Sequence, residues 1–192
     1  MTTEERIKMF LDLCEKINFN LPSEFYGWLN DNGFFTAPAS TKYHGAYEGG
    51  LFDHSFTVTK RLMKLSVDNK LEWKRKESPF IIGMFHDLCK CDQYILADGS
   101  VLGDIGDSTI TSPYGTHYEY NQNTILKGHG SKSIILLSQF ITLTEEEALC
   151  IRYHMGAYET DEWKEFDAAI RKYQTVLWTH MADMLASKVD NV

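Results

Sequence analysis

The stretch Phe80-Ile-Ile-Gly-Met-Phe-His-Asp-Leu-Cys-Lys90 decides what fold this sequence is expected to have. Its first six residues form an apolar run interrupted only by a glycine, and we expect this run to be buried. His86 and Asp87 follow it directly. A carboxylate at the end of a buried run costs free energy unless it is paired with a cation or bound to a metal. The dipeptide alone would also fit a solvent-exposed helix end, so its meaning depends on the rest of the chain.

Helical periodicity and capping residues extend outward from this stretch in both directions. The expected helices cover about residues 3–17, 23–32, 51–67, 80–88, 130–140, 144–153 and 165–187. Ser23 is expected as an N-cap, and Thr144 with the glutamates after it has the pattern of a capping box. From about residue 91 to 128 glycines, tyrosines and β-branched residues replace this pattern, and Ala97-Asp-Gly-Ser100 predicts a hairpin turn. The predicted fold class is all-α, a helical bundle in one domain over residues 1–192 with a partly β insertion.

The composition limits the partners and the location that we expect. Acidic residues number 27 and basic residues 19, so the formal net charge of −8 argues against a surface for duplex nucleic acid. A small phosphorylated substrate is compatible with this charge, because a bound divalent metal would supply local positive charge. The acidic N-terminus and the lack of a long apolar run predict neither a signal peptide nor a membrane helix, so we expect a cytoplasmic protein. The composition does not indicate an oligomeric state.

The four cysteines are not spaced as a structural zinc site. They are Cys14, Cys89, Cys91 and Cys150, and none forms a CxxC pair. We therefore expect four reduced thiols in a reducing compartment.

Histidines and aspartates recur on or at the ends of the other expected helices. The fragments are Asp53-His54-Ser55, Gly128-His129-Gly130, Tyr153-His154-Met155 and His180-Met-Ala-Asp183. Imidazole nitrogens and carboxylate oxygens together suit first-row divalent metals. Helices that cross in a bundle can direct such side chains to one interior point. The chain is therefore a candidate for a metal site assembled from several helices.

The order of these residues resembles the HD superfamily of metal-dependent phosphohydrolases. The resemblance covers about residues 43–188 and is carried by five short motifs in the family's order. They are GGLFDHS around His54, HDLCK at 86–90, KGHG at 127–130, the histidine at 154, and HMADM at 180–184. The pattern is similar to the subgroup with two additional histidines between the HD pair and the final aspartate, in its HDxxK variant. An HD-domain helical bundle is the fold that this resemblance implies.

The same resemblance implies which residues bind metal. His54, His86, Asp87 and Asp183 would ligate one divalent ion, and His129 and His154 would complete a second site with Asp87 bridging. Two such ions can activate a water and hold the phosphoryl oxygens of a substrate. The ligand types do not distinguish manganese, iron, magnesium, nickel, cobalt and zinc.

Several other residues are candidates for contacts with the substrate. Lys90 matches the lysine of the HDxxK motif and is expected to face the metals, where it could neutralise a phosphate, although a solvated lysine at a helix end is the simpler alternative. His44 and His180 are further candidates, with packing or support of a ligand as their alternatives. Arg152 and Lys132 are weaker ones. Tyr94, Tyr114, Tyr118 and Tyr120 would form a satellite cluster or a lid that stacks on a base, and His117 is expected to be exposed or to pack.

The function expected from this pattern is hydrolysis of a phosphoester in a nucleotide or short oligonucleotide, with Asp87 and Lys90 as catalytic residues. The lysine at position 90 and the absence of Glu-Asp after the HD pair disfavour two other HD variants, the five-prime nucleotidases and the alarmone hydrolases. Two alternatives remain open. One is an HD-type di-iron oxygenase, because iron fits the same ligands. The other is a non-catalytic module that binds a nucleotide in the same pocket.

Overall fold

The computed structural model describes residues 1–97, 118–126, 128–157 and 162–192, and this part of the chain is mostly helical. The helices are α1 (Thr3–Lys16), α2 (Ser23–Asp31), α3 (Gly50–Asp68), α4 (Ser78–Phe85), α5 (His129–Leu137), α6 (Glu145–Arg152), α7 (Trp163–Lys172) and α8 (Thr175–Leu185). A 3₁₀ turn covers Leu88–Cys91 and a π-helical turn covers Ala186–Asp190. The prediction of a helical protein with a small β part is confirmed at this level.

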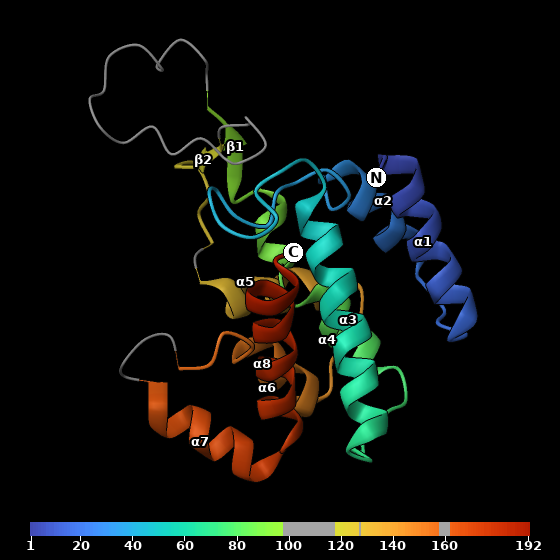
Figure 1. The fold of residues 1–192 in the computed structure, drawn as a ribbon, viewed down its shortest axis with the longest axis vertical. Helices are drawn as coiled ribbons and strands as arrows, with labels where there is room; N and C mark the ends of the chain where they lie inside the picture. The colour runs from blue at the N-terminus through green and yellow to red at the C-terminus, as the bar shows by residue number, and fades with distance from the viewer. Residues whose placement is uncertain (98–117, 127, 158–161) are drawn as a thin grey trace.

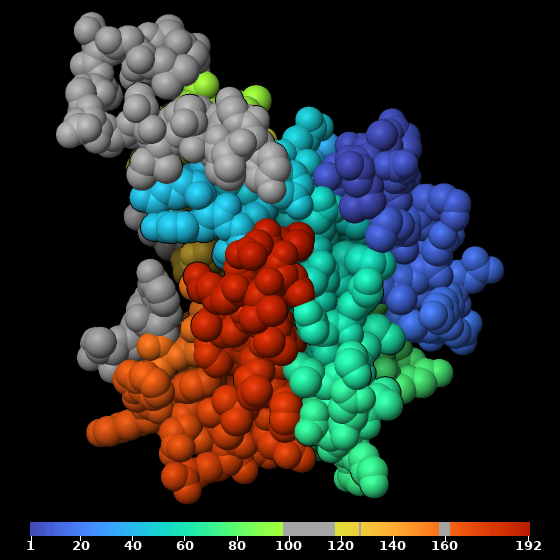
Figure 2. Space-filling view, in the orientation of Figure 1, coloured from blue at the N-terminus to red at the C-terminus, as the bar shows by residue number. Residues whose placement is uncertain are grey.

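The long helix α3 lies at the centre of the bundle. It packs against α4 and α8, while α6 packs against α4, α5 and α8. Figure 1 shows α3 and α8 side by side, α1 and α2 on one flank, and α7 at the end opposite the small sheet. In the space-filling view, α8 and the π-helical turn form one column against α3 (Figure 2). The helices that carry the candidate ligands are therefore neighbours.

Aromatic side chains fill the interior between α1, α2, α3 and α4. Phe10, Phe25 and Phe85 are fully buried, and the Phe25 and Phe85 ring centroids lie 4.9 Å apart in an edge-on arrangement. Phe80, at the start of the apolar run in α4, is also buried and lies 5.8 Å from Phe85. Such pairs add to the free energy gained from burying apolar area. The burial predicted for the run before His86 is confirmed.

The helix boundaries confirm one capping prediction and correct another, together with the extent of one helix. Thr144 and Glu147 form the predicted capping box, and Thr2 with Glu5 forms a second one at the start of α1. Ser23 is the first residue of α2 and not its N-cap, because the extended Pro22 precedes it. The single helix expected over 165–187 is wrong, since Tyr173 is extended and separates α7 from α8.

The insertion contributes the two strands of the described sheet. β1 (Tyr94–Leu96) pairs antiparallel with β2 (Tyr118–Tyr120), with Tyr94 opposite Tyr120. Their rings lie 5.2 Å apart, and Tyr94 is nearly buried while Tyr120 is 56% exposed. The predicted hairpin turn falls largely on residues 98–100, and Tyr114 and His117 fall on 98–117, so these predictions lie outside the described residues.

The cysteines and the apolar character of the helices were also subjects of predictions from the sequence. Cys14, Cys89, Cys91 and Cys150 are all free thiols. Within the described ranges, no helix combines the length and the apolar character that crossing a membrane would require.

Candidate metal centre

The structure brings all six expected ligands together around the carboxylate of Asp87. Five helices supply them, some from within the helix and some from its end. His54 lies on α3, His86 and Asp87 directly follow α4, His129 is the first residue of α5, His154 follows α6, and Asp183 lies on α8. Three of the four histidines and Asp87 are buried, at 2% exposure or less. The convergence that the spacing predicted from separate helices is therefore present in the fold.

One group of donor atoms faces Oδ2 of Asp87. His86 Nε2 lies 3.3 Å and His54 Nε2 3.7 Å from this oxygen. The two Nε2 atoms lie 3.3 Å from each other. Asp183 closes the group, with its Oδ1 at 3.1 Å from His54 Nε2 and 3.9 Å from His86 Nε2. We call these four residues the inner group.

A second group faces Oδ1 of the same carboxylate. His154 Nε2 lies 3.4 Å and His129 Nδ1 3.9 Å from Oδ1. The Cys89 sulfur lies 3.9 Å from Oδ1 and 3.8 Å from His129 Nδ1. We call Asp87, Cys89, His129 and His154 the outer group. Each oxygen of Asp87 thus faces one set of donors, which is the arrangement that a bridging carboxylate requires.

Main-chain oxygens orient the three buried histidines. Nδ1 of His54 lies 2.8 Å from the main-chain oxygen of Val192, and Nδ1 of His86 lies 2.9 Å from the carbonyl oxygen of Gly83. Nδ1 of His154 lies 2.8 Å from the carbonyl of Ile151. A main-chain oxygen only accepts, so each Nδ1 is a donor and each ring directs its Nε2 toward Asp87. Metal-binding histidines are commonly oriented by such a second hydrogen bond.

The inner group fits a cation better than any neutral arrangement. The Nε2 atoms of His54 and His86 and the oxygens of Asp87 and Asp183 face one another within 3.1–3.9 Å in a buried space. If neither Nε2 carries a proton, all of these atoms only accept hydrogen bonds, and they repel one another when water is excluded. Extra protons on the rings or a bound cation would relieve this repulsion. Imidazole and carboxylate donors at such spacing can hold a first-row divalent ion, and His54, His86 and Asp87 form one such cluster.

Lys90 places a positive charge against this cluster. It lies on the 3₁₀ turn after α4, is 7% exposed, and its Nζ is 2.6 Å from Asp87 Oδ2. Burial opposes the charge of the ammonium, but the Asp87 charge and hydrogen bond outweigh it and raise the pKa of Lys90. Burial likewise opposes the charge of Asp87, but Lys90 and then His86 hold the pKa of that carboxyl well below its usual range. The pair is therefore ionised.

Asp183 is ionised for similar reasons. Burial would raise its pKa, but the hydrogen bond and charge of His54 outweigh burial and lower it. In contrast, burial and then the Asp87 charge raise the pKa of the Cys89 thiol to about 12.

Two glycines allow the close helix contacts that assemble the groups. A Cβ on Gly83 of α4 would lie 2.6 Å from the Thr59 Cα of α3, so only glycine lets His54 and His86 approach this closely. A Cβ on Gly130 of α5 would lie 2.6 Å from the backbone oxygens of Ile151 and Arg152. That contact joins α5 to the end of α6 and brings His129 near His154.

His44 lies beside the inner group. Its ring centroid is 5.0 Å from that of His54, and its buried Nδ1 has no hydrogen-bond partner among the described residues. Burial, followed by the charges of His54 and Lys90, lowers the pKa of His44 to about 4. The structure therefore places a neutral ring with one unpartnered nitrogen beside the inner group.

The other predicted substrate contacts, His180, Arg152 and Lys132, each have partners of their own within the protein. His180 Nδ1 is 2.8 Å from the His154 carbonyl, so this ring supports the loop that carries a ligand. Arg152 pairs with Glu162 and lies over the Tyr153 ring. Lys132 is buried and pairs with Asp92, and its Nζ also donates to the Thr124 hydroxyl at 2.8 Å.

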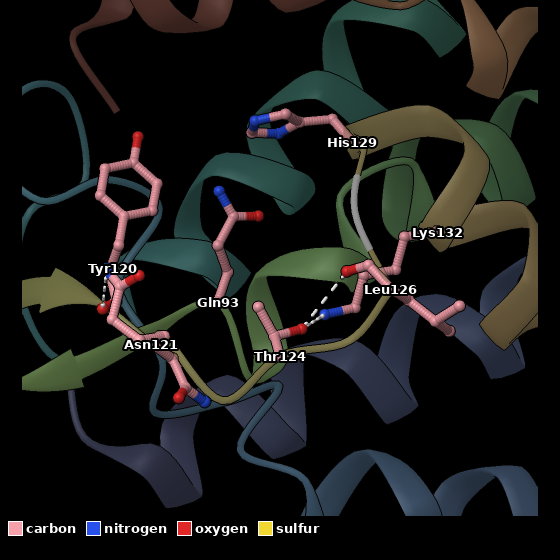
Figure 3. A pocket seen from close by; sticks show the side chains of 9 residues that line it. Gln93, Tyr120, Asn121, Thr124, Leu126, His129 and Lys132 are labelled. Atoms are coloured by element: carbon pink, nitrogen blue, oxygen red, sulfur yellow. Dashed lines mark hydrogen bonds between the residues drawn. The ribbon is translucent and has the colours of Figure 1, made fainter.

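A pocket of about 300 Å³ adjoins the outer group. His129 forms part of its wall, with Gln93, Tyr120, Asn121, Thr124 and Lys132 among the other lining residues. Figure 3 shows the Gln93 amide pointing toward the side of the pocket that holds His129, and the Tyr120 ring standing at the opposite wall. The 33% exposure of the His129 side chain marks where the metal-ligand cluster meets this pocket.

Cys89 is the residue of this site that the sequence interpretation missed. It forms a second cluster of potential metal ligands with Asp87 and His129. The Cys89-Lys-Cys91 spacing does not match a structural zinc motif, and nothing local in the sequence joins Cys89 to His129.

Comparisons with known proteins identify no relative, since no protein-family model, no curated protein and no solved structure matches this chain. A function can therefore be inferred only from the residues and the geometry of the site.

Proposed function

We propose that this chain is an HD-type metal-dependent phosphohydrolase that cleaves a phosphoester in a nucleotide or short oligonucleotide. The observation that carries the proposal is the Asp87 carboxylate with two different donor groups, one on each oxygen, at 3.3–3.9 Å. The ligand order along the chain, H…HD…H…H…D, and the supply of these six ligands by five helices agree with an HD domain.

The inner group would hold one divalent ion and the outer group a second, with Asp87 shared. Divalent ions at such a site, when bound, supply Lewis acidity that stabilises negative charge on a phosphoryl group and lowers the pKa of a coordinated water. The chain's contribution is to fix the donors in advance. The three main-chain oxygens that accept from the histidine Nδ1 atoms keep each Nε2 directed at Asp87.

Lys90 is the residue that we assign to the phosphoryl oxygens. Its ammonium is buried, charged and held at the edge of the inner group by Asp87. A fixed positive charge in a site with little water stabilises developing negative charge more strongly than a solvated one. His44, neutral and with one free nitrogen, lies close enough to His54 to contact the same substrate group.

The pocket beside His129 would hold the part of the substrate that is not phosphate. Its volume of about 300 Å³ is at the lower end for small-molecule sites, which suits a nucleoside better than a polymer. Amide, hydroxyl and phenol groups line it, and these can recognise a base and a sugar. The net charge of −8 also favours a small substrate over a long nucleic acid.

The experiment that tests this proposal is hydrolysis of a panel of phosphomonoesters, measured as phosphate release, and of phosphodiesters such as dinucleotides, measured as formation of the monoester product. The protein would be freed of metal and reloaded separately with Mn²⁺, Co²⁺ and Fe²⁺. We expect turnover with the wild type, its loss in Asp183→Asn, and its retention in Asp167→Asn, an exposed aspartate of α7.

Two other results would contradict the proposal. Oxygen uptake by the Fe²⁺-loaded protein without hydrolysis of any phosphoester in the panel would favour the di-iron oxygenase. Tight nucleotide binding without turnover in any metal form would favour a binding module.

A further inference from the structure

The outer group differs chemically from the inner group because it contains a thiol. Cys89 is fully buried on the 3₁₀ turn that follows the His-Asp pair. Its backbone N–H donates to the Ser133 hydroxyl of α5 at 3.1 Å, which fixes the turn against the helix that carries His129. Its sulfur faces Asp87 Oδ1 and His129 Nδ1 at 3.9 and 3.8 Å.

These separations match those between ligands of one ion. Donors that each lie about 2.0–2.3 Å from a tetrahedral ion lie about 3–4 Å from one another. A thiol hydrogen bond at such lengths is weak, so the contact with Asp87 alone gives little reason for a buried sulfur to point at a carboxylate. Asp87, Cys89 and His129 thus have the separations of a coordination set, and His154 faces the same oxygen of Asp87.

The other cysteines do not share this environment. Cys150 is buried, and its thiol faces the Thr175 hydroxyl at 3.7 Å. Cys91, on the same 3₁₀ turn as Cys89, instead lines a groove with Gly33 and Thr36. The turn therefore directs one cysteine toward the outer group and the other away from it, which makes Cys91 a matched control.

We propose that Cys89 binds the outer ion as a thiolate, so that the outer site has sulfur, nitrogen and oxygen donors. This inference rests on the proposed metal centre. Ion binding transfers the thiol proton to solvent and forms a metal–sulfur bond. Thiolate ligands favour zinc, cobalt and iron over magnesium and manganese, whereas the inner group offers imidazole and carboxylate only. The two sites would therefore prefer different metals, and the outer site would not be filled by Mg²⁺.

The test is a Co²⁺ titration of the metal-free full-length protein, monitored by absorption spectroscopy. We expect the wild type to bind Co²⁺ and to develop the intense near-ultraviolet band of sulfur-to-cobalt charge transfer. Cys89→Ser should lose the band and release part of its cobalt at a lower chelator concentration. Cys91→Ser should keep both the band and the affinity.

The outcomes separate this inference from the proposed function. Cobalt binding without the charge-transfer band in the wild type would overturn the role of Cys89 and leave the metal centre standing. No cobalt binding above background would overturn the metal centre and this inference with it. Because the wild-type spectrum carries the test, a Cys89→Ser variant that fails to fold does not prevent a result.

Discussion

The two sides of Asp87 are built differently, although they share one carboxylate. On the Oδ2 side His54 and His86 are fully buried and Asp183 closes the group. On the Oδ1 side the His129 side chain is 33% exposed and forms part of a pocket wall. A closed group is suited to hold an ion permanently. An open group is suited to exchange its ion or to contact a substrate. We therefore expect the inner group to retain its ion and the outer group to contact the substrate.

The helices that supply the two sides also differ. The inner group comes from within α3, from the end of α4 and from the last turn of α8, which continues directly into the π-helical turn Ala186–Asp190. The outer histidines come from the first residue of α5 and from the loop after α6. Helix ends are less constrained than helix centres. The comparison therefore predicts that disruption of the inner side has the larger effect.

The largest effect on activity and metal content is expected from removing one ligand of the inner group or one ligand of the outer group. Asp183→Ala should lose the inner ion and reduce kcat by more than about 10³-fold, because a missing ion removes more than a single transition-state contact. His129→Ala should retain the inner ion and lose only the outer one. Metal analysis and kinetics on both variants measure the difference. Equal metal loss in the two variants would mean that the sides are not separate sites.

The next effect is expected at Lys90. Lys90→Gln should keep its metal and its fold and should reduce kcat by about 10²–10³-fold, the usual effect of losing one group that stabilises transition-state charge. Lys90→Arg should restore part of the rate. The metal content of Lys90→Gln decides between this role and a structural one. Loss of metal together with activity would show that the lysine only supports Asp87.

A smaller effect is expected from the two glycines at the helix contacts. Gly83→Ala and Gly130→Ala should each destabilise the fold by about 1–3 kcal/mol, because a Cβ would overlap backbone atoms of the neighbouring segment. Gly83→Ala should weaken the inner ion and Gly130→Ala the outer one. Denaturant unfolding of the metal-free proteins and chelator titration of the loaded ones measure the two effects. The same chelator sensitivity in both variants would contradict the assignment.

The smallest effect is expected in the pocket beside His129. Tyr120 is 56% exposed, so Tyr120→Leu should not disturb the fold. If its ring stacks on the substrate, KM should rise on the order of fivefold, equivalent to about 1 kcal/mol, with kcat unchanged. Tyr43→Leu, at an exposed tyrosine outside this pocket, is the control. An unchanged KM for Tyr120→Leu would remove the pocket from substrate binding.

Much of the fold could be predicted from the sequence because its helices carry local signals. The capping box at Thr144 and the buried run before His86 are of this kind. The break between α7 and α8 could not be predicted, because neither glycine nor proline marks it. Contacts from distant residues hold it instead, with the Tyr173 hydroxyl donating to Glu145 at 3.0 Å and the Thr175 hydroxyl to Glu146 at 2.6 Å.

In the candidate site, too, some features could be predicted from the sequence and others could not. The six expected ligands could be identified because their order along the chain resembles a known family, and the structure brings them together. Cys89 could not be identified in this way, because its partner His129 lies 40 residues away and no local spacing joins them. The orientation of the histidines by backbone carbonyls also has no sequence signal, because any residue can supply a carbonyl.

The most direct test of the central claim is the metal content of the purified protein beside Asp87→Ala, with Asp167→Ala as the control, after loading with Co²⁺. Because Asp87 faces both groups, we predict about two ions per chain in the wild type and the control, and the loss of both in Asp87→Ala. A variant that keeps both ions would contradict the account, since the shared carboxylate would then not be the centre of the site.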